Sequence, residues 1–475
     1  MVNQYLLLFF RIKFNGKDVR KLTLKSLIHK FKIDDTYIVL DINSGAVHKI
    51  DKITYEILDY YPEVSAENII EKLSNKYNKI EIIEVLEELD QLMEEGLLFS
   101  QECYSEVKQI LYKDKAIKAM CLHIAHDCNI SCRYCFASQG NFKGQRILMS
   151  SEIGRKSIDF LVRNSGNRRN LEVDFFGGEP LMNFDVVKDI VNYGRTLEKK
   201  YNKHFRFTIT TNAMLLTEEI MDYINENMDN IVLSIDGDKN TNDYMRRTIN
   251  GEGTYDIILP KITRMIEKRG EKSYYVRGTF TKHNINFSKD VIHLAEQGFK
   301  HISVEPVVTE PDQEYALEKE ELPTIFEEYE ILAKEYLNRK GKDNEFSFFH
   351  FMIDLSQGPC IYKRLSGCGA GNEYIAVTPE GDVYPCHQFV GNHKFKMGSV
   401  LEEELDNRIQ DIFIGANVLN KDKCNSCWTR FYCSGGCHAN AFNFNKDVLI
   451  PHDIGCEMEK KRLECALMIQ AHLFG

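Results

Sequence analysis

The cysteine run at residues 128–135 constrains this chain more than any other feature of its sequence. Its three cysteines, Cys128, Cys132 and Cys135, have CxxxCxxC spacing and follow closely on the apolar segment 119–125. A cubic 4Fe–4S cluster has four irons, whereas this run supplies only three thiolate ligands. Unless a fourth ligand comes from elsewhere, one iron stays open to a small molecule, which favours a site for chemistry over a structural site.

The composition is typical of a soluble globular protein of about three domains. The 475 residues are 43% hydrophobic, with a mean hydropathy of −0.35 and a net charge of −11. No apolar run reaches the roughly 18 residues of a membrane span. The apolar segment 6–10 lacks the flanks of a signal peptide. We therefore expect a cytoplasmic protein that has no membrane partner.

Charge is distributed unevenly along the chain. Residues 1–32 contain eight lysines and arginines but only one acid, Asp18, so the remainder is strongly acidic. A basic tail could attract nucleic acid or lipid, but we interpret residues 1–26 as a basic, poorly ordered extension. The acidic body argues against nucleic acid as a partner.

The number and grouping of cysteines indicate metal sites. The chain has 14 cysteines, and most lie within residues 128–135 and 360–456. The reducing cytosol opposes a disulfide framework, so metal binding or catalysis is the default explanation. Cys121 lies in an apolar run, and we interpret it as a small buried hydrophobe.

Residues 27–100 form a compact unit in this interpretation. The β-rich segments 36–42 and 46–51 are joined by the hairpin signal Asn43-Ser44-Gly45. Three helical patterns follow, the clearest ending at Gly96, and residues 97–100 could return as a short strand. This order predicts a winged-helix-like module, a type that more often binds a partner than catalyses. The charged residues 101–118 are predicted to be a linker.

Residues 119–310 alternate short apolar strands with helical patterns such as 151–163 and 184–200. The predicted strands are 119–125, 171–176, 205–211, 230–234, 275–281 and 301–305. This alternation favours parallel βαβ units and an α/β fold, a partial TIM-type (β/α)6 barrel. In such barrels the chemistry lies at the carboxyl ends of the strands.

Three features follow or end predicted strands, and we therefore expect them to share one site. The cysteine run follows the first strand, Gly177-Gly178-Glu179-Pro180 follows the second, and Ser234 ends the fourth. Residues 311–358 are predicted to be an acidic helical bridge. From residue 359 to residue 475 the regular alternation stops, and cysteines, glycines and turns dominate, so this segment is expected to need metal to fold.

Zinc is the alternative metal for the cysteine run. A structural zinc site normally has four ligands, and no fourth cysteine or histidine lies close downstream. His123 and His126 lie just upstream and are interpreted as strand-end or loop histidines. Tyr134 stands between two of the cysteines, where its ring could cover a bound planar group.

The cysteine run and the Gly-Gly-Glu-Pro segment, in this order, resemble those of the radical S-adenosylmethionine (SAM) enzymes. The resemblance implies that the open iron chelates the amino and carboxylate groups of SAM. It also implies close backbone approach at Gly177 and Gly178, and that Glu179 helps to hold the ammonium group. By itself, Gly-Gly-Glu-Pro also makes an ordinary turn from a strand into a helix.

Two further segments extend this resemblance. Ser234 resembles the residue that contacts the SAM ribose, and Arg246 resembles the arginine that pairs with the SAM carboxylate, for which its forked guanidinium is suited. Arg247 is adjacent to Arg246, so Arg246 is chosen because its position matches the spacing in the family. The alternative for both segments is that their polar residues lie at the surface and bind nothing. Thr211-Asn212-Ala213 departs from the more usual Thr-Asn-Gly, which leaves its contact role open.

The C-terminal cysteines resemble the SPASM extension, which holds two auxiliary 4Fe–4S clusters. Cys368 and Cys386 flank Gly381, and the pattern Cys424-x2-Cys427-x5-Cys433-x3-Cys437 precedes Cys456. The resemblance implies one ligand set of Cys424, Cys427, Cys433 and Cys456, and another of Cys368, Cys386 and Cys437. Cys360 is either the fourth ligand of the latter set or absent from it, which would leave an open iron. The alternative is two zinc sites.

Over residues 27–470 the chain resembles the maturases of six-cysteines-in-forty-five-residues (SCIFF) peptides. The supporting segments are 41–48, 122–128, 136–140 and 384–389. The resemblance implies three 4Fe–4S clusters, SAM, and a one-electron donor such as flavodoxin or ferredoxin. It implies that the N-terminal module binds the leader of a small cysteine-rich precursor peptide.

The reaction implied by this resemblance is the formation of a thioether. A deoxyadenosyl radical takes hydrogen from the α-carbon of an acceptor residue, a threonine in family members, and a peptide cysteine sulfur joins that carbon. Other SPASM reactions stay open: formylglycine formation, epimerisation and carbon–carbon crosslinking. A zinc-stabilised peptide-binding scaffold is the alternative that is not an enzyme.

Overall fold

The computed structural model describes residues 13–14, 17–18, 24–101, 115–355, 361–402 and 405–473. The extension at residues 1–26 and the linker at residues 101–118 fall largely outside these ranges, and Cys360 falls wholly outside them. Within the extension, β1 (Lys13–Phe14) pairs with β2 (Lys17–Asp18). Among the described helices, none is long and apolar enough to cross a membrane.

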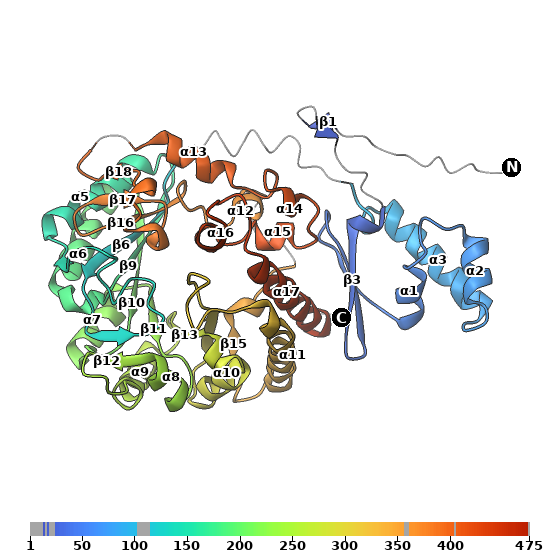
Figure 1. Ribbon diagram of the computed structural model, residues 1–475, viewed down its shortest axis with the longest axis horizontal. Helices are drawn as coiled ribbons and strands as arrows, with labels where there is room; N and C mark the ends of the chain where they lie inside the picture. The colour runs from blue at the N-terminus through green and yellow to red at the C-terminus, as the bar shows by residue number, and fades with distance from the viewer. Residues whose placement is uncertain are drawn as a thin grey trace.

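The N-terminal unit is a three-stranded antiparallel sheet followed by three helices (Figure 1). After η1 (Leu24–Leu27), the strands are β3 (Ile28–Ile33), β4 (Thr36–Asp41) and β5 (Val47–Ile50). The helices are α1 (Lys52–Ile57), α2 (Ala66–Leu73) and α3 (Lys79–Glu94). The predicted hairpin and three helices are thus present, and β3 is an additional strand.

The short strand predicted at residues 97–100 is wrong. Ser100 is instead tied to the hairpin, because its backbone N–H donates to Asp41 Oδ2 at 2.9 Å. The Asn43 amide in turn donates to the Ser100 carbonyl at 2.8 Å. Hydrogen bonds to side chains thus take the place of the backbone hydrogen bonds to a neighbouring strand that a β-strand needs.

Six parallel strands form the centre of the α/β domain in the order of the sequence. They are β6 (Ala119–His126), β9 (Asn170–Gly177), β10 (His204–Thr211), β11 (Asn230–Ser234), β13 (Tyr275–Phe280) and β14 (His301–Pro306). The intervening helices are α5 (Ser151–Asn164), α6 (Phe184–Tyr201), α7 (Glu218–Asn227), α8 (Lys239–Met245), α9 (Tyr255–Arg269) and α10 (Phe287–Glu296). All six predicted strands are confirmed, and the closure of the sheet as a partial barrel stays a prediction.

The sheet continues beyond both predicted ends of this domain. At one end β16 (Tyr374–Val377) pairs in parallel with β6, and β17 (Asp382–Tyr384) and β18 (Gly398–Ser399) follow antiparallel. At the other end β15 (Ser347–Phe348) pairs with β14. The short β8 (Ile147–Leu148) also pairs with β6. The C-terminal segment is therefore built onto the strand that precedes the cysteine run.

The remaining elements are short, apart from two long helices. They are β7 (Ile130–Cys132), η2 (Pro180–Asn183), β12 (Arg246–Thr248), η3 (Lys282–Asn284), η4 (Lys319–Glu321), α11 (Leu322–Arg339), η5 (Phe349–Phe351), α12 (Ile361–Ser366), η6 (His387–Phe389), η7 (His393–Phe395), α13 (Asn407–Gly415), α14 (Asp422–Asn425), α15 (Arg430–Cys433), α16 (His438–Asn445) and α17 (Asp453–Leu473). Helix α17 packs against α11 and against the N-terminal sheet.

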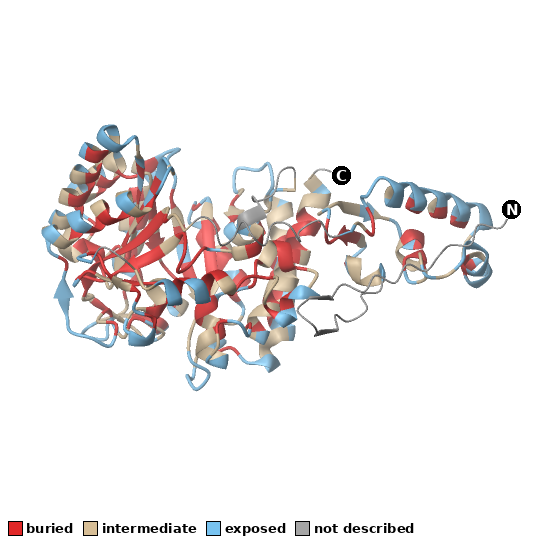
Figure 2. Ribbon diagram, turned by 90° about the horizontal axis from the view of Figure 1, so that it is seen from above, coloured by how far each residue is buried: buried red, intermediate tan, exposed pale blue. Residues whose placement is uncertain are grey.

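Buried residues gather along the central strands and the helices that cover them, whereas much of α2 and α3 is exposed (Figure 2). The inward side chains of β9 and β10, such as Phe175 and Phe207, are fully buried. Cys121 on β6 is 2% exposed, which confirms that it is a buried hydrophobe. This rigid sheet positions the loops that follow its strands.

Candidate functional site

The predicted site residues meet in one cavity at the carboxyl ends of the parallel strands. This cavity has a volume of about 220 Å³. The predicted residues in its wall are Cys128, Cys132, Tyr134, Cys135, Gly177, Gly178, Ser234 and Arg246. Of the residues predicted for the first cluster and SAM, Glu179 does not line the cavity. Four separate loops thus contribute to one surface, as expected where parallel strands end together.

Burial keeps the thiols of Cys128 and Cys132 protonated in the absence of a metal. It raises the pKa of Cys128 to about 11 and that of Cys132 to about 12. The thiols of Cys128, Cys132 and Cys135 also interact electrostatically with one another, so they lie close together. Metal ligation would require them to release protons, and the nearby Arg246 guanidinium favours that release.

The Gly-Gly-Glu-Pro loop is fastened to the backbone that leads into Cys128. The N–H of Gly178 donates to Ala125 O at 2.7 Å, and the N–H of Glu179 donates to Asp127 O at 2.9 Å. A Cβ on Gly178 would overlap the carbonyl oxygen of Asp127. Glycine is therefore required here because two loops of the chain itself approach closely.

Glu179 braces this loop against the next strand instead of facing the cavity. Its carboxylate accepts hydrogen bonds from the N–H of Leu181 at 3.0 Å, the hydroxyl of Thr211 at 2.8 Å and the N–H of Asn212 at 2.7 Å. The side chain is fully buried, and burial raises its pKa to about 7. Its role as a partner of the SAM ammonium stays a prediction.

The segment Thr211-Asn212-Ala213 lies beside the first cysteine. The Asn212 amide donates to Asn129 Oδ1 at 2.8 Å and lies 3.7 Å from Cys128 Sγ. Ala213 has a φ of +66°, the left-handed conformation that glycine adopts freely. The backbone therefore keeps the turn typical of Thr-Asn-Gly, at a cost of roughly 1–2 kcal/mol for alanine.

Arg246 lies in the cavity wall because β12 pairs with β7, which places it opposite Cys132. Its Nη1 donates to the Tyr134 hydroxyl at 3.2 Å, and that hydroxyl donates to Asp236 Oδ2 at 2.7 Å. Arg246 is 6% exposed, and within the described residues its Nε has no hydrogen-bond partner. A buried guanidinium nitrogen without a partner is suited to receive a carboxylate, so these residues fit SAM.

The neighbouring Arg247 does not share this position. Its Nε donates to the Asp243 carbonyl at 3.0 Å, which turns the side chain toward α8. The structure therefore separates two adjacent arginines that the sequence alone did not distinguish.

Two acidic residues of the cavity were missed by the sequence analysis. Asp236 accepts from Tyr134 and from the N–H of Thr279 at 3.0 Å. Glu305 is the next-to-last residue of β14, and Ser303 Oγ donates to its Oε1 at 3.1 Å. Both lie at or just past a strand end on the same edge of the sheet as the cysteines, and this position was the signal that could have found them.

The His350 imidazole and two arginines, Arg277 and Arg462, keep Glu305 ionised. His350 Nε2 lies 3.3 Å from Glu305 Oε1, and Arg462 Nη1 lies 2.7 Å from His350 Nδ1. Because arginine only donates, Nδ1 is the acceptor, and Nε2 carries the proton that faces Glu305. Burial would raise the pKa of Glu305, but His350, Arg277 and Arg462 lower it well below its usual range.

The described C-terminal cysteines fall into two groups. The thiol of Cys386 interacts electrostatically with those of Cys368 and Cys437. The thiol of Cys433 interacts with those of Cys424, Cys427 and Cys456. This grouping follows the two ligand sets that the resemblance implies. None of the described cysteines forms a disulfide; among the described residues, no group of three or more His, Cys, Asp or Glu is placed to hold a single metal ion.

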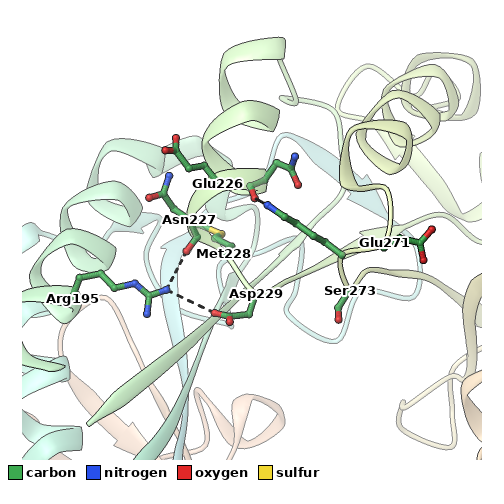
Figure 3. A pocket seen from close by; sticks show the side chains of 9 residues that line it. Arg195, Glu226, Asn227, Met228, Asp229, Glu271 and Ser273 are labelled. Carbon is green, nitrogen blue, oxygen red and sulfur yellow. Dashed lines mark hydrogen bonds and ion pairs between the residues drawn. The ribbon is translucent and has the colours of Figure 1, made fainter. Parts of the chain in front are cut away.

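A second pocket lies at the amino-terminal ends of the strands, opposite to the cysteine-lined cavity, and it is polar (Figure 3). Arg195 Nη2 donates to Asn227 O at 3.3 Å and pairs with Asp229, just before β11 begins. The other wall contains Glu271 and Ser273, before β13. In α/β folds this amino-terminal edge serves stability more than chemistry, which leaves the cysteine-lined cavity as the candidate site.

Comparison with known proteins identifies two domains in the chain. Residues 122–295 match the radical SAM superfamily, and residues 368–428 match the SPASM iron–sulfur cluster-binding domain. The radical SAM cyclopropyl synthase TigE of Paramaledivibacter caminithermalis is 21% identical, over 88% of this chain and 90% of its own. A cysteine-type anaerobic sulfatase-maturating enzyme of Clostridium novyi is 23% identical, over 69% of this chain and 89% of its own.

Solved structures show the same fold. Native anSMEcpe with bound AdoMet has a TM-score of 0.62 at 19% identity, covering 74% of this chain and 99% of its own. Streptococcus suis SuiB bound to its precursor peptide SuiA has a TM-score of 0.52 at 16% identity, covering 90% of this chain and 98% of its own. The cavity, the fold and the two domain matches agree, and the chain therefore contains a radical SAM domain at residues 122–295, followed by a SPASM iron–sulfur cluster-binding domain at residues 368–428.

Proposed function

We propose that this chain is a radical SAM enzyme that installs a thioether crosslink in a ribosomally made, cysteine-rich SCIFF precursor peptide. The observation that carries the radical SAM part is the cavity wall that three cysteines share with the buried Arg246, whose Nε has no hydrogen-bond partner among the described residues. A peptide substrate is supported by relatives, since SuiB was solved with a precursor peptide. The SCIFF assignment rests on the sequence segments that resemble those maturases.

Several residues of the chain would hold the cofactors. Cys128, Cys132 and Cys135 would ligate a 4Fe–4S cluster, Arg246 would pair with the SAM carboxylate, and Ser234 would contact the ribose. When bound, the cluster and SAM supply a carbon-centred radical that takes one hydrogen atom from the substrate. The protein would contribute the distances between the reacting groups.

Glu305 and Arg277 give the same cavity a charged wall where a substrate can lie. Both residues line the cavity, on the neighbouring strands β13 and β14. Because the network of His350 and Arg462 keeps Glu305 ionised, it can accept a hydrogen bond from an N–H or hydroxyl group of the peptide. For the same reason it is unsuited to donating a proton at neutral pH.

The first auxiliary cysteine group lies close to this cavity. Gln388 lines the cavity, and Cys386 is two residues before it in the chain. We propose that Cys368, Cys386 and Cys437 hold an auxiliary cluster there, with Cys360 as a candidate fourth ligand. The peptide would lose two hydrogens in all: a hydrogen atom from the α-carbon, and a proton from the thiol together with one electron that passes to the protein.

The N-terminal unit is proposed to bind the leader of the peptide. Strand β5 lies at the edge of the three-stranded sheet, so an extended peptide can add to it as a further strand. Side chains of β3 and β4 are buried more deeply than those of β5. The open edge is thus the more exposed side of the sheet.

Mass spectrometry of a reconstituted reaction tests this function. The full chain, loaded anaerobically with iron and sulfide, is incubated with SAM, dithionite and a cysteine-rich peptide that carries its leader. We expect the peptide to lose two hydrogens and one thiol that iodoacetamide can alkylate. A carbon–carbon crosslink would also lose two hydrogens but would keep every thiol, and epimerisation would leave the mass unchanged.

A matched pair of variants links the reaction to the cavity. Arg246→Ala should abolish both deoxyadenosine formation and crosslinking, whereas Arg247→Ala should retain both. Deoxyadenosine without any change in the peptide would overturn the thioether assignment and spare the radical SAM one. One zinc per site in place of about twelve irons per chain would overturn both.

A further inference from the structure

Lys421 is a fully buried lysine in the middle of the cysteine-rich C-terminal segment. It immediately precedes α14, and its side chain is 0% exposed. Its Nζ donates to the carbonyl oxygen of Gly435 at 2.7 Å. Gly435 lies between Cys433 and Cys437, so the ammonium group is held against the loop that carries these two cysteines.

The loop is shaped for this approach. Gly435 has a φ of +91°, which side-chain-bearing residues rarely adopt, and a Cβ there would lie 3.3 Å from Lys421 Nζ. The backbone of Lys421 is fixed as well, because its carbonyl accepts from the N–H of Cys424 at 2.9 Å. A buried ammonium with one hydrogen bond to a neutral carbonyl needs an anionic neighbour to offset the loss of water.

Once the cysteines ligate metal as thiolates, both cysteine groups would supply anionic neighbours to Lys421. The ammonium interacts electrostatically with Cys424 and Cys433 of one group, and with Cys368 and Cys437 of the other. Burial lowers the pKa of Lys421, and these four thiols raise it. Lys460, by comparison, interacts with Cys427 and Cys456, which belong to one group only.

We propose that Lys421 supplies one positive charge shared by the two auxiliary clusters, and that this charge raises the reduction potential of both. The proposal rests on the two ligand sets described under the proposed function. A cluster ligated by thiolates is anionic and gains a further negative charge on reduction, so a nearby cation favours the reduced form. In a buried setting this attraction is stronger than in water.

The placement gives Lys421 a role in accepting the electron that thioether formation releases. With its charge between the two groups, an electron is stabilised at whichever group receives it. Lys421 is therefore a positioning residue that acts through the cysteine ligands, not a group that touches the peptide.

Redox titration of the reconstituted full chain, followed by electron paramagnetic resonance, tests this proposal. The signal that changes when SAM is added marks the cluster of the cavity, so the remaining signals report the auxiliary clusters. Lys421→Met removes the charge and the hydrogen bond, Lys421→Gln removes the charge and keeps a donor, and Lys421→Arg keeps both. Lys423→Met is the matched control, because Lys423 pairs with Asp453 on the surface and is 57% exposed.

We expect the Met and Gln variants to have more negative potentials at both auxiliary clusters, with the Arg variant and the Lys423 control close to wild type. Unchanged potentials, a shift at one cluster alone, or a Gln variant that behaves like wild type would overturn the proposal. If the Met and Gln variants lose auxiliary iron while the Arg variant keeps it, the proposed role of the positive charge is supported, because the clusters then need that charge in order to assemble. Loss in all three variants would instead indicate a structural tether and overturn the proposal.

Iron content separates this test from that of the proposed function. About twelve irons per wild-type chain support three clusters, and the potentials then judge Lys421 alone. About four irons would show that the auxiliary ligand sets are wrong, and the proposal for Lys421 would fall with them.

Discussion

The two cysteine regions of this chain are positioned by different kinds of structure. In the cavity, Cys128 follows β6, and Arg246 is set opposite Cys132 by the pairing of β12 with β7. In the C-terminal region, Cys424 and Cys433 belong to four-residue helices, α14 and α15. A parallel sheet can place ligands before any metal arrives, whereas elements this short gain little stability of their own.

Each of the two regions also contains a buried cation, but the two cations are placed differently. Arg246 lines the cavity, and within the part of the chain that the structure describes its Nε has no hydrogen-bond partner, so it is ready for a ligand from outside the chain. Lys421 is closed off from solvent and directed at the backbone of Gly435. One cation is thus placed to bind a molecule that comes and goes, and the other to act on a permanent part of the protein.

Removal of ligands should produce the largest difference between the two regions. We expect the double variant Cys424→Ala/Cys433→Ala to lose amide hydrogen-exchange protection across residues 422–445, since metal ligation contributes roughly 10 kcal/mol or more to small metal-dependent folds. Cys128→Ala/Cys132→Ala should leave β9 and β10 protected. Equal loss of protection in both double variants would show that the two regions do not differ in their dependence on metal.

The stability of the α/β domain should depend on pH through Asp290, a buried residue on α10. Burial raises its pKa to about 7, so the folded state prefers the protonated acid. Stability from this group is present below pH about 4 and is lost as pH rises to about 7, by roughly 4 kcal/mol. Thermal unfolding of Asp290→Asn should show a flatter pH profile.

The C-terminal region should respond to pH in the opposite sense, because acid protonates thiolates and weakens metal ligation. Hydrogen exchange at pH 5 and pH 7 can follow both regions in one sample. Asp256→Asn is a control, since Asp256 is exposed on α9 and should leave the profile unchanged. A wild-type slope in Asp290→Asn would contradict the assignment to Asp290.

The two adjacent arginines sharpen the description of the cavity. Loss of a buried charged pair costs about 2–5 kcal/mol, so Arg246→Ala should weaken SAM binding by about 30-fold or more. Arg247→Ala should stay within about threefold, because Arg247 is directed at the Asp243 carbonyl. Equilibrium dialysis with SAM measures both, and similar losses would show that the cavity does not distinguish them.

The smallest predicted effect concerns the contact between the N-terminal unit and the C-terminal cysteine region. His29 of β3 stacks on Trp428, with ring centroids 3.7 Å apart, directly after Cys427. Trp428→Ala should destabilise this contact by about 1 kcal/mol and raise hydrogen exchange in β3. Trp428→Phe, which keeps a stacking ring, should retain most of the protection, and an unaffected β3 in the Ala variant would show that other contacts hold the unit.

Much of the fold and of the site could be predicted because local signals were strong. The strands of the α/β domain are apolar and are followed by recognisable motifs, such as the cysteine run and Gly-Gly-Glu-Pro. The spacing of the cysteines indicates which of them are metal ligands. The residues that were missed depend on distant parts of the chain. Glu305 matters because His350 and Arg462 lie behind it, and Lys421 because it is buried beside Gly435. No local pattern records such burial.

Boundaries between domains were less predictable than the domains themselves. The change of pattern near residue 359 gave no sign that a further strand would join the sheet, yet β16 adds to β6, whose open edge offers unpaired N–H and carbonyl groups. Cys360 lies outside the described residues, so its place in a ligand set stays a prediction.

The pairing of β16 with β6 has a consequence for how the protein is made. Tyr374 lies opposite Ala119, so the two partners are separated by roughly 250 residues of chain. At about 5–20 residues per second, a ribosome needs some tens of seconds to deliver the later strand. Throughout this interval the strand leading to the first cysteine run keeps one bare edge, a site for misassembly. Maturation of the cavity should therefore be a late event, completed only after nearly the whole chain has left the ribosome.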